Sequence, residues 1–236
     1  MIRSRLCFLF IAIISIAAES RCQLFEEDYP SLDDFRSLGI STAAQNFEPS
    51  GGNTLADSAK IRIKTPLWLA EYRQMGLRVA FGYSSYMFNN DSRSEISLAA
   101  ESVTDIALTT GSRRGNFFLP IVISTNFVEA SGASNSSKDF NIADVGIGTG
   151  MKFEQLWENF GVQLTGVGII YYSTPGFSVE SGSSTALEAE LQFLFRDIIG
   201  EGMTAGYRFE FQKWSMSDKT QNYSRQFQGP YVGIFF

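Results

Sequence analysis

From about residue 36 onward, apolar side chains recur at every second position along most of the chain. In 203–213 one face holds Met203, Ala205, Tyr207, Phe209 and Phe211, and the other holds Thr204, Gly206, Arg208, Glu210 and Gln212. The same alternation occurs in 61–69, 77–84, 117–127, 145–153, 160–172 and 185–195, and more weakly near 103–111 and 36–47. A period of two is that of a β-strand, so the pattern predicts an all-β fold.

The lengths of these runs and of their connections favour a barrel. The runs exceed the roughly 5–6 residues of an ordinary strand and fit the roughly 9–11 residues of a tilted strand that crosses a membrane. Short connections are expected at 70–76, 111–116, 154–159 and 196–202, and longer polar ones at 89–102, 129–140, 173–183 and 215–224. Short turns that alternate with longer loops are typical of transmembrane β-barrels.

The end of the chain carries the most specific signal. Counting back from Phe236, the alternate positions Ile234, Val232 and Pro230 are all apolar. This ending resembles the C-terminal strand of Gram-negative outer-membrane β-barrels. The resemblance implies that the last strand closes the barrel and that Val232, Ile234 and Phe236 are read as a signal by the barrel-assembly machinery. It covers about residues 36–236, concerns the architecture and identifies no subfamily.

We therefore predict a transmembrane antiparallel up-and-down β-barrel of about ten strands in the cell outer membrane. Bacterial barrels have an even number of strands, with both ends of the sheet on the periplasmic side. An exported N-terminus meets this requirement only if 36–47 forms the first strand, which is the weakest segment of the pattern.

A soluble antiparallel barrel or sandwich with its apolar face inward is the alternative, because alternation alone does not distinguish inside from outside. The placement of aromatic residues favours the membrane. They gather near the predicted short turns, as at Trp68, Trp157, Phe160 and Phe236, and near the longer loops, as at Tyr83, Tyr86, Phe127, Tyr172 and Trp214. Two such belts are expected at the two faces of a bilayer.

The N-terminus predicts export. Arg3 and Arg5 precede an apolar run over 6–18, which is too short to span a bilayer, so residues 1–22 are interpreted as a signal peptide and 23–35 as an acidic tail. Cleavage after Cys22 or nearer Ala18 both fit. Lipidation of Cys22 is the alternative, and Arg21 before it argues against that. With a formal net charge of −6, the chain is a poor partner for nucleic acid.

The chain contains no histidine. Serine–histidine–aspartate hydrolysis and histidine-ligated metal sites need an imidazole. The outer-membrane enzymes that share the barrel architecture generally rely on one too. We therefore expect no enzymatic activity and no cofactor.

A set of charged residues lies opposite the apolar face and is expected to point into the lumen of the barrel. It comprises Arg62, Lys64, Arg78, Asp105, Asp144, Lys152, Glu188, Glu190, Arg208 and Glu210. These residues could fill a narrow lumen with ion pairs or line a polar path across the membrane. A barrel of about ten strands is only slightly wider than the eight-stranded size that side chains fill, which favours the first interpretation.

The functional expectation is a non-enzymatic, monomeric barrel with a structural or narrow passive channel-like role. The expected partners are outer-membrane lipid and the assembly machinery. The alternative is a surface-binding or adhesion protein that acts through its extracellular loops. The sequence leaves open whether the lumen is plugged and which solute or ligand is involved.

Overall fold

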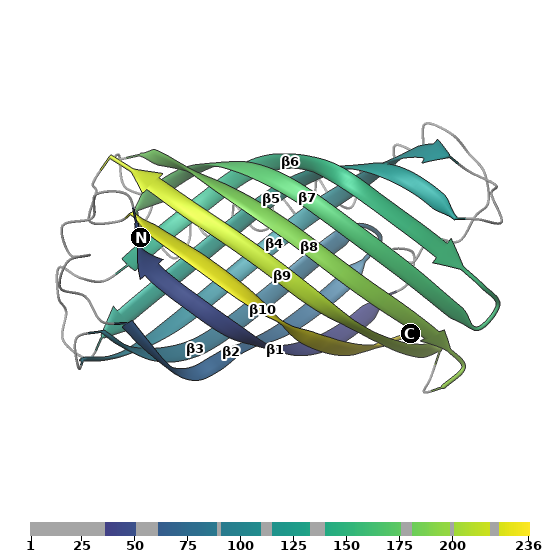
Figure 1. The fold of residues 1–236 in the computed structure, drawn as a ribbon, viewed down its shortest axis with the longest axis horizontal. Coiled ribbons are helices and arrows are strands. Elements are labelled where there is room, and N and C mark those ends of the chain that lie inside the picture. The colour runs from purple at the N-terminus through teal and green to yellow at the C-terminus, as the bar shows by residue number, and fades with distance from the viewer. Residues whose placement is uncertain are drawn as a thin grey trace.

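The computed structural model describes residues 36–50, 61–88, 91–109, 115–132, 140–175, 181–198, 201–217 and 222–236, and the predicted signal peptide and acidic tail lie outside them. Ten antiparallel strands form one closed barrel (Figure 1). They are β1 (Ser37–Pro49), β2 (Ile61–Gln74), β3 (Leu77–Phe88), β4 (Asp91–Thr109), β5 (Asn116–Gly132), β6 (Phe140–Leu156), β7 (Phe160–Pro175), β8 (Gly182–Arg196), β9 (Gly202–Met216) and β10 (Tyr223–Phe235). Within the described residues, no helix has the length and apolar character needed to cross a membrane.

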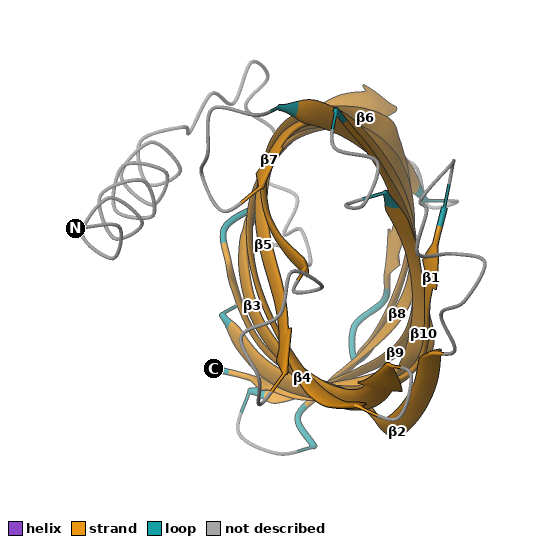
Figure 2. Ribbon diagram, turned by 90° about the vertical axis from the view of Figure 1, so that its left-hand side faces the viewer, coloured by secondary structure: helices purple, strands orange, loops and turns teal. Residues whose placement is uncertain are grey.

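Every strand pairs with its neighbours in sequence, and β1 pairs with β10 to close the ring (Figure 2). The β1–β10 register runs from Ser37 opposite Phe235 to Pro49 opposite Tyr223. The predictions of an up-and-down barrel, of a first strand near 36–47 and of closure by the last strand are therefore confirmed.

The two ends of the barrel differ in their connections. β2 and β3 are joined by Met75 and Gly76, both at positive φ (47° and 75°), as in the tight two-residue turns that suit twisted hairpins. The β6–β7, β8–β9 and β4–β5 connections lie at the same end, as does the C-terminal residue. We call this the turn end and the opposite end the loop end.

The predicted loop at 89–102 is wrong. Most of it belongs to β4, which pairs with β3 from Phe88 opposite Asp91 to Leu77 opposite Ser102. The segment looks like a loop because its inward positions are polar or small, as at Glu95 and Ser97, which are both buried. The alternating outward residue Ile96 is 41% exposed and marks the strand.

The predicted apolar face points outward on β5 to β10, as exposed Ile147, Ile170 and Leu187 illustrate. On β2 the assignment is reversed, because Leu67 and Leu69 are buried inside, where they pack with Phe227 and Ala43. The lumen has room for these two leucines because a Cβ on Gly82 would lie 2.9 Å from Leu69 Cδ2. Part of the lumen is thus an apolar core.

Candidate functional site

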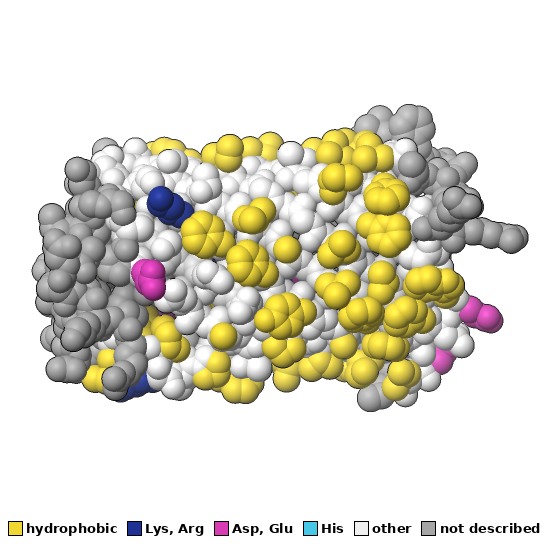
Figure 3. All heavy atoms as spheres, in the orientation of Figure 1, with side chains coloured by type: hydrophobic (Ala, Val, Ile, Leu, Met, Phe, Trp, Pro, Cys, Tyr) yellow, Lys and Arg dark blue, Asp and Glu magenta, His cyan; other side chains and the backbone are white. Residues whose placement is uncertain are grey.

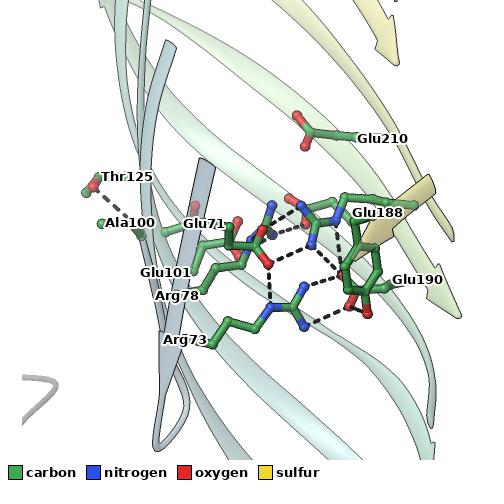
Figure 4. Close-up of polar contacts among 12 residues, drawn as sticks. Glu71, Arg73, Arg78, Ala100, Glu101, Thr125, Glu188, Glu190 and Glu210 are labelled. Atoms are coloured by element: carbon green, nitrogen blue, oxygen red, sulfur yellow. Dashed lines mark hydrogen bonds and ion pairs between the residues drawn. The ribbon is translucent and has the colours of Figure 1, made fainter. Parts of the chain in front are cut away.

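Seven charged residues meet inside the barrel, and we call them the ionic cluster: Glu71, Arg73, Arg78, Glu101, Glu188, Glu190 and Arg208 (Figure 4). β2, β3 and β4 supply the first four, and β8 and β9 supply the other three. Arg208 lies with Nη1 2.7 Å from Glu71 and Nη2 2.7 Å from Glu190. Arg78 contacts Glu101 at 2.8 Å and Glu188 at 3.3 Å.

The ionic cluster spans the lumen from wall to wall. Four strands separate β3 from β8 in either direction around the ring, so the Arg78–Glu188 ion pair joins opposite walls. Tyr231 on β10 donates a hydrogen bond of 2.9 Å to Glu190, and its ring lies 5.3 Å from the guanidinium of Arg73. Each arginine of the cluster has at least two carboxylate partners, which offsets the cost of removing these charges from water.

The predicted residues Arg78, Glu188, Glu190 and Arg208 all lie in this cluster, whereas Glu71, Arg73 and Glu101 were not among the predicted ones. The last three fell in segments that the sequence assigned to a turn or a loop. A continued period of two places Glu71 and Arg73 on one face with Leu69, and two charges on that face were the signal that it points into the lumen.

A second polar network lies between the ionic cluster and the loop end. Arg225 contacts Glu95 at 3.3 Å and Glu210 at 3.2 Å. Asp144 accepts hydrogen bonds from Gln212 at 2.8 Å and from the indole of Trp214 at 3.0 Å. The predicted lumen residues Glu210 and Asp144 therefore face inward, and each has a partner from another strand.

Nearer the loop end, the lumen is filled by seven buried residues that we call the apolar cluster: Tyr86, Val128, Ala130, Ile142, Trp214, Met216 and Tyr223. They come from β3, β5, β6, β9 and β10, so the cluster joins facing walls. Tyr86 and Trp214 were predicted for the outer aromatic belt, and this is wrong, because they are 2% and 0% exposed inside the barrel. Alternation within the strand, which places Trp214 on one face with Glu210 and Gln212, indicates the inward position.

Toward the turn end, a cavity of about 110 Å³ adjoins the ionic cluster. The predicted residue Lys152 lines this cavity, and its Nζ lies 2.6 Å from Oδ2 of the predicted residue Asp105. A smaller cavity of about 20 Å³ separates the ionic cluster from Arg225. In the described part of the chain, no group of three or more His, Cys, Asp or Glu side chains is placed to hold a metal ion.

The structure does not place two of the predicted lumen residues, Lys64 and Arg62, in the lumen. Lys64 is exposed on the outer surface, where its Nζ donates a hydrogen bond of 3.1 Å to Ser92 Oγ. Its assignment to the lumen was wrong because β2 turns its leucines inward, and the register shifts against β3 on both sides of Thr65. The side chain of Arg62 lies outside the described residues.

On the face shown in Figure 3, apolar side chains are spread along the outer wall, and the few charged ones lie toward its two ends. Large apolar residues are more than 40% exposed all around the ring, as at Ile40 on β1, Ile147 on β6, Leu187 on β8 and Val232 on β10. A closed sheet with charges inside and apolar residues outside suits lipid, because every interior strand group is paired and no edge remains. The chain folds as a β-barrel of the transmembrane type.

No description of a protein family matches the chain, and no curated protein does. Solved structures with some likeness to this barrel include Ail, the attachment invasion locus protein of Yersinia pestis, at 14% identity and a TM-score of 0.25, covering 86% of this chain and 99% of that one. The outer-membrane protease OmpT of Escherichia coli has 8% identity and a TM-score of 0.33, covering 89% and 99%. The toluene transporter TodX of Pseudomonas putida has 9% identity and a TM-score of 0.28, covering 92% of each chain. These likenesses assign no activity.

The last strand of the barrel presents its predicted signal to the outside. Val232, Ile234 and Phe236 are 44%, 46% and 51% exposed on the outer wall, while their neighbours Tyr231 and Phe235 face the lumen. Recognition of these residues by the assembly machinery stays a prediction.

Proposed function

We propose that the protein is a non-enzymatic barrel with a closed lumen and a structural role in the outer membrane. The observation that carries this proposal is the presence of two layers in series, the ionic cluster and the apolar cluster, each built from facing walls. Passive diffusion of a solute would require both layers to open.

Opening either layer is costly. Removing one partner from a buried ion pair typically costs about 3–5 kcal/mol, and a path through the ionic cluster must separate several such pairs. A path through the apolar cluster must expose Trp214 and Ile142, which are both 0% exposed. The structural role therefore has more support than the passive channel-like role.

The absence of histidine from the whole chain supports the proposal that the protein is not an enzyme. The carboxylates of the ionic cluster are held by arginines, which leaves them poorly suited to transfer protons.

The proposed partners are the lipid around the barrel and the assembly machinery. The proposal includes a monomeric state, since closure by β1 and β10 leaves no sheet edge for self-association. The alternative of a surface-binding protein remains a prediction, because loop-end residues 51–60, 133–139, 176–180 and 218–221 lie outside the described ones.

The proposal is tested by solute flux into liposomes. Purified protein reconstituted into liposomes should admit small sugars and amino acids no faster than protein-free liposomes do. A general porin reconstituted at the same protein-to-lipid ratio is the positive control. Swelling at a rate that rises with the amount of this protein would overturn the proposal and favour the channel-like role.

A further inference from the structure

Glutamates outnumber arginines in the middle of the lumen. Within the ionic cluster, four glutamates share three arginines. Arg225 is shared in turn by Glu95 and Glu210. Glu210 also lies directly opposite Glu188 in the β8–β9 register. Like charges in directly opposite positions repel each other, so this part of the lumen carries an excess of negative charge.

The excess falls on Glu101 and Glu188, which share one nitrogen. Arg78 Nη1 lies 2.8 Å from Glu101 Oε2 and 3.3 Å from Glu188 Oε2. Among the described residues, the Oε1 atoms of both glutamates have no hydrogen-bond or ion-pair partner. By contrast, Glu71 contacts three arginines and Glu190 contacts two. A buried carboxylate with a single shared partner is poorly compensated for its loss of water.

The two free oxygens face open space. Glu101 and Glu188 both line the turn-end cavity of about 110 Å³. Glu101 is 7% exposed and the side chain of Glu188 is 15% exposed, although the ring of strands around them is closed. Neither Oε1 atom is among the fully enclosed polar atoms that lack a partner. The cavity therefore presents two carboxylate oxygens that can accept hydrogen bonds.

The basic residues that line the same cavity already have partners. Arg73 and Arg78 each contact at least two carboxylates, and Lys152 Nζ lies 2.6 Å from a carboxylate oxygen of Asp105. An anion would have to displace one of these partners in a poorly hydrated lumen, which is unfavourable. A cation would instead supply the charged hydrogen-bond donor that the two free oxygens lack.

Part of the cavity wall is apolar. Val122, Val167 and Ile169 belong to one buried cluster with Val103 packed against it, and all four line the cavity. Val167 lies directly opposite Glu188 in the β7–β8 register, so the apolar part of the wall begins beside the carboxylate. A ligand with a charged head and a short alkyl body would meet both parts of the wall.

From this arrangement we propose that the turn-end cavity binds a small organic cation, namely a primary alkylammonium ion whose N–H groups donate to Glu101 and Glu188. The size suits a short chain, since an apolar cavity of about 150 Å³ accommodates benzene and this one is somewhat smaller. Ser37 and Gly76 at the turn end belong to the lining, so the cation approaches from that end and neither layer has to open. The site goes beyond the structural role proposed above and does not depend on it.

The test uses valine-methyl NMR spectra of the refolded barrel in an uncharged detergent, titrated with n-butylammonium chloride and with n-butanol. The two probes have nearly the same size and shape, but only the first is charged. Butylammonium should shift the methyl signals of Val103, Val122 and Val167 saturably. It should bind about tenfold more tightly than butanol, because its charge strengthens a hydrogen bond that both probes can donate. The methyls of Val128 in the apolar cluster and of Val145 on the outer wall should not follow the same curve.

Glu188→Gln locates the ammonium group. The variant keeps the size of the side chain and removes its charge, and it should refold because Arg78 retains Glu71 and Glu101 as partners. Butylammonium should then bind about tenfold more weakly, with the affinity of butanol, while the affinity of butanol stays the same. Glu158→Gln is the matched control, because Glu158 is an exposed carboxylate in the β6–β7 connection at the same end of the barrel. It should change neither affinity.

Val122→Phe locates the alkyl body, because it fills the cavity and should remove binding of both probes. Ile123→Phe places the same ring on the outer wall, where Ile123 is 46% exposed. This control should leave both affinities unchanged.

The proposal is overturned if the cavity methyls show no saturable shift with butylammonium, or if Val145 shifts in parallel with them, which would indicate partition into detergent. Equal affinities for the two probes also contradict it, because the excess carboxylate would then need no cation. A preference for the cation that survives Glu188→Gln contradicts it as well. Should Glu188→Gln fail to refold, Glu101→Gln decides in its place, since it removes the other carboxylate that shares Arg78 Nη1 and should lower the preference in the same way.

Discussion

The ionic cluster and the apolar cluster close the same lumen with opposite chemistry. In the ionic cluster, Arg73, Arg78 and Arg208 share four glutamates, and each contact depends on a definite geometry. In the apolar cluster, side chains such as those of Ile142, Val128 and Trp214 fill the space between facing strands. The indole of Trp214 also donates a hydrogen bond to Asp144. One region is stabilised by complementary charge and the other by packing.

This difference teaches that the two layers should respond to different kinds of change. Loss of one charge leaves its former partners buried with too little compensation, so a single substitution in the ionic cluster should have a large effect. The apolar cluster should tolerate a swap that conserves volume and respond to one that creates a cavity.

The largest effect is expected for Arg208→Ala in the ionic cluster. This variant removes one partner each from Glu71 and Glu190 and should lower the free energy of unfolding by about 3–5 kcal/mol. The measurement is the urea or guanidinium unfolding midpoint of the refolded barrel in detergent.

Lys213→Ala supplies the matched control for that variant, because Lys213 is an exposed cation on the outer face of the same strand. Its loss should cost no more than the roughly 0–1 kcal/mol of a surface charge pair. Equal midpoints for the two variants would mean that water screens the ionic cluster and that the lumen is wide and wet.

A somewhat smaller loss is expected for Ile142→Ala in the apolar cluster. A cavity left by a buried isoleucine typically costs about 2–5 kcal/mol, and Ile142 is 0% exposed. Ile147→Ala on the outer face of the same strand is the control, and it should cost less because detergent or lipid can fill the space. If Ile147→Ala proved the more damaging of the two, the inner and outer faces of β6 would be exchanged.

The smallest effect is expected for Tyr231→Phe, which keeps the ring and removes one hydroxyl. The hydrogen bond from Tyr231 to Glu190 is lost, while both arginines keep their position over the ring. The loss should be about 1.5–3 kcal/mol, as for a hydrogen bond to a charged group, read from the same unfolding curves. A loss as large as that of Arg208→Ala would show that the tyrosine, and not the arginine, organises the ionic cluster.

The sequence predicted the charged layer better than the apolar one. Arg78, Glu188, Glu190 and Arg208 could be found because a charge opposite an alternating apolar face has no place in lipid. Tyr86 and Trp214 could not be found by that rule, because an aromatic residue near a strand end suits a membrane interface as well as a filled lumen.

The barrel architecture could be predicted from the period of two, the number of strands and the C-terminal strand. Which face of a given strand points into the lumen, and where that strand ends, could not be predicted. The inward face of β2 was predicted wrongly because Leu67 and Leu69 pack inside against Phe227, and this contact joins strands that are distant in sequence. β4 was predicted as a loop because its lumen-facing row, which includes Arg93, Glu95, Ser97 and Glu101, has the composition of a loop. Both errors arise from the interior, whose polarity depends on which side chains meet across the ring.

The most direct test of a lumen closed by two layers is ion conductance across a planar lipid bilayer. The account predicts no steady current for the unaltered protein and none for Arg208→Ala alone, because the apolar cluster still closes the lumen. Current should appear only when Arg78→Ala and Arg208→Ala are combined with Trp214→Ala, which opens both layers. A steady, reproducible single-channel current through the unaltered protein would contradict the account.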